Sequence, residues 1–352
     1  ILFGNNTKQK YFIYGRRVAM PNLHEFKELY DAALEFKKLK PWKWISNTDI
    51  FGVLNPNTNV VGYCSVMGGL GENKGLAVYL GAEGLESIMK IFMGEIKPDD
   101  PEGIITQKCL ALTFGSEDDL NPLDSAVVWD LNMSFKGRNP YPIFRSLVPG
   151  FFPWNINTEE CRFLTIVLRQ VIDVANRCKD NIKLIRPDIS GKFFVRVPKK
   201  SGKSLEWKDA YLPPDLYEQE FYTFVLTDEV RLMRLKNSKF KRCGSWEVDT
   251  FYSPSPVENK FYRPYYPRVL ICFNHETAEP ITYHFIKNIQ ENGYEFVDAL
   301  LSAIEDKKTI PRALYVLKDE THVLFSDIAE RLGIEIIMSD SLNIIRKARY
   351  DM

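Results

Sequence analysis

The chain has 352 residues, and at about 150 residues per domain this length favours two domains over one. Hydrophobic residues make up 45% and charged residues 26%, a composition typical of a soluble globular protein. The chain has 46 basic residues (lysine and arginine) and 46 acidic residues (aspartate and glutamate). Its net charge therefore creates no overall electrostatic field that would attract nucleic acid or an anionic membrane. No apolar run reaches the roughly 18 residues of a membrane span.

The cysteines indicate a reducing compartment. They are scattered without a C-x-x-C pair, and most stand inside apolar runs, where free cysteine behaves as a small buried hydrophobe. A chain of this length needs no disulfide staples, and its first ten residues lack the zones of a signal peptide. We therefore expect reduced cysteines, a cytoplasmic location and no membrane partner. The six are Cys64, Cys109, Cys161, Cys178, Cys243 and Cys272.

The first part of the chain predicts a helix and an antiparallel sheet. A helix is expected over 21–39, where apolar residues recur on one face. Two strand-like runs follow, joined by Asn-Pro-Asn-Thr at 55–58, and a third strand is expected over 76–80. A second helix passes through 85–92, where apolar residues recur at helical spacing.

A glycine-rich stretch, residues 66–85, raises the question of a phosphate site. A phosphate cradle needs a strand, a loop and then a helix, whereas this loop lies between two strands. It has no G-x-G-x-x-G, and glycine follows Lys74 where a P-loop has serine or threonine. The similar Ser-Gly-Lys-Ser at 201–204 has Val197 in place of the leading glycine. We interpret 66–85 as a hairpin connection, with an anion site as the alternative.

The middle of the chain is rich in aromatic residues. After a strand over 109–115, residues 137–160 read as an ordered loop whose rings cover the sheet. A stacking platform for bases or a proline-rich peptide is the alternative, using Phe151, Phe152 and Trp154. A helix over 159–177 follows, capped by Asn157 or Thr158, and residues 179–192 form the best linker.

The second part starts with a hairpin over 192–212 and a helix over 227–235. A basic run at 236–242 includes Lys239, Lys241 and Arg242. Such a run is read as a solvated face, with phosphate contacts as the alternative.

The last eighty-odd residues predict a mixed sheet covered by helices. A strand at 268–274 and a strand at 281–286 form a hairpin, and helices then alternate with strands. The last helix is expected to be capped by Ser339 or Asp340. The remaining elements are a helix through 297–304, a strand at 313–317, a helix through 325–332 that Gly333 closes, and a strand at 334–338.

This order resembles the ribonuclease-H-like fold, particularly the integrase core, through "IPRALYVLKDE" and "LGIEIIMSD". In that superfamily, carboxylates on the first strand, after the fourth strand and near a late helix hold two divalent metals. The resemblance puts these positions at Asn274, Asp319 and Asp340. Asn274 is an amide without the charge that a metal needs, and Glu276 is the nearest substitute. The resemblance therefore implies a degenerate nuclease fold.

The whole chain is also similar to uncharacterised bacterial proteins made of paired domains of unknown function. The similarity lies in "GYCSVMGGLGENKGLAVYLGAEGL" and "NPYPIFRSLVPGFFPWNINTEE", and in "WEVDTFYSPSPV" with "RPYYPRVLICF". It implies a bacterial source and no established activity.

Together these patterns predict an α+β protein with an N-terminal module over 1–180 and a C-terminal module over 190–352. No catalytic template is complete: "HETAE" lacks the second histidine of H-E-x-x-H, so no metal or cofactor is expected. The leading hypothesis is a non-enzymatic binding or scaffold protein of unknown ligand, for which a protein partner and a nucleic acid are the alternatives. The alternative is a metal-dependent nuclease or phosphoryl-transfer enzyme using Asp319, Asp340 and Glu276. A third is a nucleic-acid-binding protein using the basic run and the aromatic loop.

Overall fold

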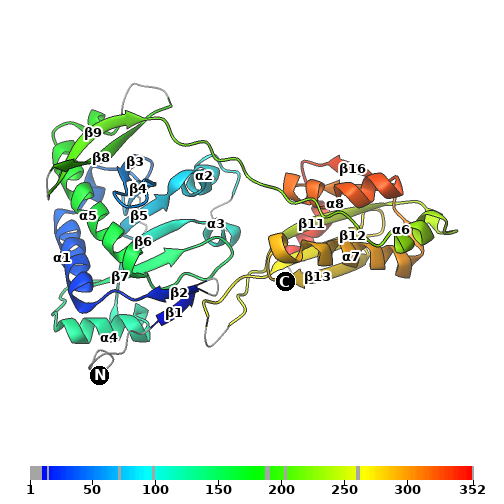
Figure 1. The fold of residues 1–352 in the computed structure, drawn as a ribbon, viewed down its shortest axis with the longest axis horizontal. Coiled ribbons are helices and arrows are strands. Elements are labelled where there is room, and N and C mark those ends of the chain that lie inside the picture. Colours follow the sequence, from blue (N-terminus) through cyan, green and yellow to red (C-terminus); the bar gives the residue numbers. More distant parts are fainter. Residues whose placement is uncertain are drawn as a thin grey trace. The chain divides into compact units, whose positions relative to one another are not determined.

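The chain forms two compact units in a computed structural model, which describes residues 10–13, 16–69, 73–96, 100–186, 191–201, 204–258 and 262–350. The N-terminal unit comprises Ile1–Tyr217 with Glu258–Pro264, and the C-terminal unit comprises Glu218–Val257 with Tyr265–Met352 (Figure 1). The predicted α+β class is confirmed. None of the helices in the described ranges combines the length and apolarity that a bilayer crossing demands.

The N-terminal unit is built on a seven-stranded sheet in the order β7-β6-β5-β4-β3-β8-β9. Neighbouring strands are antiparallel except β3 and β8, which are parallel. The glycine-rich stretch joins β4 to β5, and Met67 pairs with Gly75, which confirms the hairpin; its residues 70–72 lie outside the described ranges. The strands are β3 (Phe51–Leu54), β4 (Val61–Met67), β5 (Gly75–Leu80), β6 (Cys109–Gly115), β7 (Tyr141–Leu147), β8 (Phe193–Ser201) and β9 (Ser204–Leu212).

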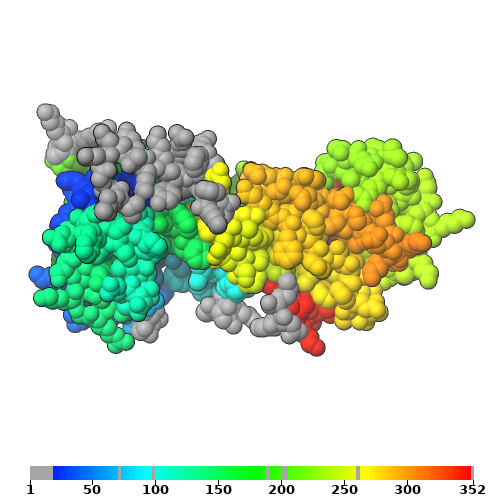
Figure 2. Space-filling view, turned by 90° about the horizontal axis from the view of Figure 1, so that it is seen from below, coloured from blue at the N-terminus to red at the C-terminus, as the bar shows by residue number. Residues whose placement is uncertain are grey.

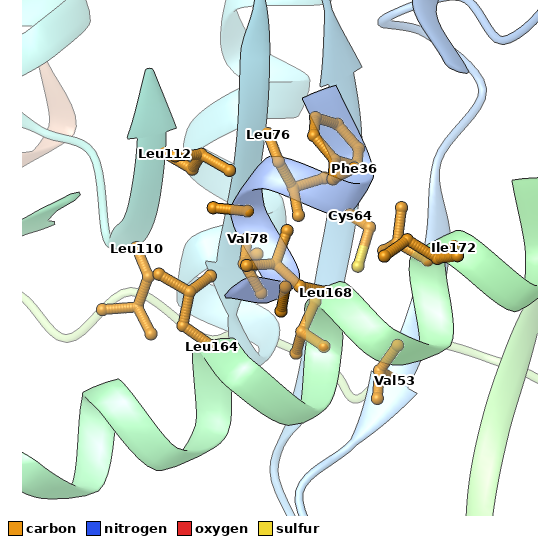
Figure 3. Packing of buried hydrophobic residues seen from close by; sticks show 14 of the residues in the cluster. Phe36, Val53, Cys64, Leu76, Val78, Leu110, Leu112, Leu164, Leu168 and Ile172 are labelled. Atoms are coloured by element: carbon orange, nitrogen blue, oxygen red, sulfur yellow. The ribbon is translucent and has the colours of Figure 1, made fainter. Parts of the chain in front are cut away.

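Two helices cover one face of this sheet, α1 (Leu23–Leu39) and α5 (Thr158–Cys178). Phe36 from α1 and Leu168 from α5 meet Cys64 and Val78 of the sheet in the main core (Figure 3). Helix α5 packs closely on the sheet at Gly62, where an added Cβ would lie 2.9 Å from the ring of Phe163. The alternate residues of the same strands point to the opposite face of the sheet, where α2 (Gly81–Phe92) packs against them.

Shorter elements complete this unit. Asn157 caps α5, accepting bonds of 2.8 and 3.0 Å from the amides of Glu159 and Glu160, so the predicted cap is Asn157 and Thr158 is helical. The remaining elements are β1 (Lys10–Ile13), β2 (Arg16–Ala19), α3 (Glu102–Ile105), α4 (Pro122–Leu131) and the 3-10 turns at Pro41–Lys43, Glu117–Asp119 and Ile182–Leu184.

Three local expectations are corrected by this sheet. The aromatic segment 137–160 contains strand β7, because proline is tolerated on an edge strand and β7 lies at the edge. The expected linker at 179–192 is tied to the N-terminal unit, since Ile185 is buried and Arg186 pairs with Asp49. The hairpin β8–β9 was expected in the C-terminal module, but it extends the N-terminal sheet through β3. Its residues 202–203, part of the Ser-Gly-Lys-Ser run, lie outside the described ranges.

The C-terminal unit contains a five-stranded sheet in the order β13-β12-β11-β15-β16. β11, β12 and β13 form an antiparallel meander, and β15 and β16 run parallel to β11. The elements are α6 (Glu229–Lys236), β10 (Lys241–Arg242), β11 (Ser245–Tyr252), β12 (Arg268–Asn274), β13 (Pro280–Ile286), α7 (Ile289–Lys307), β14 (Thr309–Ile310), β15 (Ala313–Val316), α8 (Asp319–Leu332), β16 (Glu335–Met338) and α9 (Asn343–Tyr350).

Helices cover both faces of this sheet. Trp246 and Val248 of β11 face the core formed with α7 and α8, while Phe251 and β12 residues face α9. A three-stranded meander followed by two parallel strands, each reached through a helix, is the ribonuclease-H-like arrangement, as expected. The first strand, however, is β11 and not the strand at 268–274.

Candidate functional site

Two buried carboxylates stand at the centre of β11. Glu247 and Asp249 are two residues apart, so their side chains point to the same face of the sheet, and each residue is only 2% exposed. Acidic side chains are almost never fully buried unless they are paired. The groups that surround them therefore define the chemistry of this site.

Glu247 holds the start of the last helix. Its Oε2 accepts hydrogen bonds of 3.2 Å from the amides of Ile344 and Ile345, in the first turn of α9. A carboxylate at a helix N-terminus satisfies donors that have no partner within the helix. Its Oε1 lies 3.0 Å from Nδ1 of His275. The expected cap by Ser339 or Asp340 is thus wrong, because α9 begins at Asn343 and its amides are met by a strand distant in sequence.

Asp249 lies between two protein cations. Its Oδ1 is 3.9 Å from Nζ of Lys318, and its Oδ2 is 3.7 Å from Nη1 of Arg349. Lys318 also donates to the carbonyl oxygen of Thr250 at 2.9 Å, and the Arg349 guanidinium lies 4.4 Å from the centre of the Phe251 ring. Both basic side chains are therefore fixed by contacts besides the ion pair.

A second ion pair lies on the other face of the same strand end. Arg268 of β12 pairs with Glu320 in the first turn of α8, and it donates to Oγ1 of Thr250 at 3.2 Å. Oγ1 of Thr250 is 3.0 Å from Oγ1 of Thr321. The charged groups at this end of the sheet thus link β11, β12 and α8 to one another.

The carboxylates predicted from the resemblance do not converge. Asp319 is exposed at the start of α8, and Asp340 is exposed after β16. Glu276 lies in the β12–β13 turn, where its Oε2 accepts from the amide of Ser245 at 3.1 Å. Since Ser245 begins β11 and Asp319 follows the parallel strand β15, Glu276 is at the opposite end of the sheet from Asp319. No group of three or more acidic, histidine or cysteine side chains in the described part of the chain could hold a metal ion.

Asn274, expected at the first-strand position, ends β12 instead. Its Oδ1 accepts from the amides of Glu276 and Thr277 at 2.9 Å, so it shapes a turn. The first strand is β11, and the carboxylates that it carries are Glu247 and Asp249.

The aromatic residues proposed as a ligand surface belong to the N-terminal unit. Trp154 exchanges backbone bonds of 2.7 and 3.0 Å with Ser146 of β7. Arg263 lies over Phe151, with its guanidinium carbon 5.9 Å from the ring centre, and its Nε donates to the carbonyl oxygen of Phe152 at 2.6 Å. A segment of the same chain therefore already occupies part of this surface.

The basic residues of that proposal belong to the C-terminal unit. Lys239, Lys241 and Arg242 are exposed, and Nη1 of Arg242 donates to the carbonyl oxygen of Leu332 at 2.9 Å. Ligand binding by either group of residues stays a prediction.

Family models match both units. Residues 26–196 match the model described as Domain of unknown function (DUF7309), and residues 231–352 match Domain of unknown function (DUF6930). The chain carries two domains of unknown function. A search of curated proteins finds no match.

Similar solved structures include two viral assemblies. One is a simian T-cell lymphotropic virus intasome in complex with PP2A regulatory subunit B56 gamma, at 12% identity and a TM-score of 0.24, covering 32% of this chain and 40% of that chain. The other is the HTLV-2 integrase catalytic core domain in complex with magnesium, at 14% identity and a TM-score of 0.23, covering 32% of this chain and 68% of that chain. The ribonuclease-H-like arrangement of the C-terminal unit is defined by the order and direction of its strands.

Proposed function

We propose that the C-terminal unit is a non-enzymatic binding or scaffold module, in which the buried acids of β11 stabilise the fold. The observation that supports this is the placement of Asp249 between Lys318 and Arg349, with separations of 3.9 and 3.7 Å. The two side chains supply the positive charge that a divalent cation would supply beside the same carboxylate.

The charge balance of the site argues against a metal-dependent reaction. Magnesium and calcium bind oxygen ligands at about 2.0–2.6 Å and favour several carboxylates. Here Asp249 already has two cations nearby, and both oxygens of Glu247 have hydrogen-bond partners. A metal ion would have to displace the side chains of Lys318 and Arg349 from Asp249. The negative charge of this site is too small to bind a divalent cation in their place.

Cation titration tests this proposal. Mn²⁺ or Mg²⁺ at millimolar concentration is expected to leave the melting temperature unchanged, and labelled DNA and RNA oligonucleotides are expected to stay intact. A melting temperature that rises with Mn²⁺, together with cleavage, would support the nuclease alternative, provided that Asp249→Asn removes both effects. Asp306→Asn is the matched control, because Asp306 is an exposed carboxylate of α7 and takes no part in the contacts of Asp249.

A second candidate function is the binding of a nucleic acid, and one observation supports it. The parallel pairing of β10 with β14 places Lys241 beside Thr309, and the amide of Lys241 donates to the carbonyl oxygen of Lys308. The exposed basic residues of 236–242 are thereby joined by exposed Lys307, Lys308 and Arg312, and a cluster of lysine and arginine is the usual footprint of phosphate contacts.

Salt-dependent binding separates the two candidates. If phosphates bind here, fluorescence anisotropy with a single-stranded oligonucleotide would show affinity that falls steeply between 50 and 200 mM salt. The charge reversal Lys239→Glu with Lys241→Glu would then weaken binding about tenfold or more, each lost contact lowering the salt slope by about one. The control Lys38→Glu with Lys192→Glu changes two exposed lysines of the N-terminal unit.

A further inference from the structure

Three of the four outer strands of the two large sheets carry features that discourage pairing with another chain. β9 has charged Glu206, Lys208 and Asp209, and β7 is bridged by Trp154 at Ser146. β16 has only four residues and begins with a glutamate. Charge, coverage and shortness are the usual protections of an edge strand, because its unpaired amides and carbonyls are a template for a further strand.

The fourth outer strand, β13, begins with Pro280, where its pairing with β12 is irregular, but it lacks charge, coverage and shortness from Ile281 to Ile286. It runs for seven residues, Pro-Ile-Thr-Tyr-His-Phe-Ile, without lysine, arginine, aspartate or glutamate. Tyr283 is 70% and Phe285 46% exposed, and their rings form an edge-to-face pair at 6.1 Å. Only β12 pairs with β13 among the described strands. Figure 2 shows the gold-to-orange segment that contains β13 and α7 at the surface of the C-terminal unit.

We propose that β13 pairs antiparallel with β13 of a second copy of this chain, about a two-fold axis at Tyr283. The inference is independent of the proposed function. Because the interface is formed by the same residues on both partners, the five-stranded sheet would continue across it into the partner's sheet. Tyr283 would face Tyr283 of the second copy, and aromatic cross-strand pairs stabilise such a ladder.

Charge identifies the occupant as a second copy in antiparallel orientation. Glu279 precedes the strand and Lys287 follows it. Antiparallel pairing brings the acidic end of one strand to the basic end of the other, twice per interface. Parallel pairing would place like charges side by side, which destabilises a strand pair.

Disulfide trapping tests this geometry. In the full chain with Cys243→Ser, which removes the exposed cysteine, Tyr283→Cys is expected to form a disulfide-linked dimer under mild oxidation. Directly opposite residues have Cβ atoms about 4.5–5.5 Å apart, so only a small shift is needed to form a disulfide. The control Thr277→Cys is exposed, but the two-fold axis separates its copies by about 40 Å at 3.3 Å per residue.

Sedimentation velocity provides a second readout. The wild-type chain is expected to dimerise as its concentration rises, whereas Tyr283→Lys with Phe285→Lys is expected to stay monomeric with an unchanged circular dichroism spectrum. A wild-type monomer at about 100 μM would overturn the proposal, on the scale of weak specific association. So would cross-linking of Tyr283→Cys that is no faster than that of Thr277→Cys, or a dimer that survives both lysine substitutions.

Discussion

Nδ1 of His275 lies 3.0 Å from Oε1 of Glu247, while the second oxygen of this carboxylate meets the first turn of α9. Glu247 therefore joins the start of the last helix to the first strand of the sheet. Replacing it with alanine removes these bonds and leaves the amides of Ile344 and Ile345 without this acceptor.

We expect Glu247→Ala to lower the free energy of unfolding by about 2–4 kcal/mol, the range of a lost helix cap combined with broken buried polar contacts. Urea denaturation followed by circular dichroism measures this value. Glu335→Ala, at an exposed position of β16, serves as the control and is expected to change stability by less than about 0.5 kcal/mol. Equal effects of the two substitutions would contradict the assigned role of Glu247.

The two cations beside Asp249 are expected to act together with it. Lys318→Ala combined with Arg349→Ala leaves a buried carboxylate without its counter-charges, and a loss of about 3 kcal/mol or more is expected. Adding Asp249→Asn to this double variant is expected to recover part of the loss, because it removes the charge. A triple variant less stable than the double variant would show that the ion pairs do not determine the effect of the double substitution.

The cysteines differ sharply in exposure, which predicts their reactivity. Burial raises the pKa of Cys109 and of Cys161 to about 12 and that of Cys178 to about 11, and Cys64 and Cys272 are also buried. At pH 8 a thiol with a pKa near 11 has about one molecule in a thousand as the reactive thiolate. We expect Ellman's reagent to label only Cys243 rapidly in the folded protein and all six cysteines in guanidinium. Rapid labelling that persists in Cys243→Ser would contradict this burial pattern.

Glu160 is expected to make stability depend on pH. Burial raises the pKa of this carboxyl, although it accepts bonds from the amide of Asn157 and the hydroxyl of Ser146. The folded protein therefore keeps the proton at a pH where the unfolded chain has lost it. From this residue, the free energy of unfolding falls as pH rises above the unfolded value of 4.5, by at most about 1.4 kcal/mol per pH unit.

Glu160→Gln cannot ionise and is expected to remove this contribution. Urea denaturation of both proteins between pH 4.5 and 7 measures the difference in the free energy of unfolding. The variant should become relatively more stable as pH rises. Curves that stay parallel over this range would show that the pKa of Glu160 is not raised in the folded state.

Local patterns predicted the elements well. The strands at 109–115 and 268–274 have the observed bounds, because each is a short apolar run ended by turn residues. Local patterns did not predict how strands that are distant in sequence pair with one another. The hairpin β8–β9 joins β3 in parallel, and no local pattern shows which of two sheets has a free edge to receive it.

The sequence predicted the first-strand position of the candidate site at the wrong strand for a similar reason. A proline-rich connector separates "SWEVDTFY" from the next strand, so the sequence suggested that the sheet starts at 268 and that Asn274 holds the first-strand position. A signal was present, since Glu247 and Asp249 alternate with apolar residues in one strand and must share a face. Their pairing with Lys318 and Arg349 depends on side chains from distant segments, which no local pattern reveals.

The return of the chain at 258–264 to the N-terminal unit has a consequence for how the protein is made. The side chain of Arg263 is buried there and donates to the carbonyl oxygens of Ser146 and Phe152. Because synthesis proceeds from the N-terminus, the ribosome has already released the residues of β11 before Arg263 emerges. The N-terminal unit therefore completes its native contacts only after the first strand of its neighbour has left the exit tunnel, so the two units cannot mature strictly one after the other.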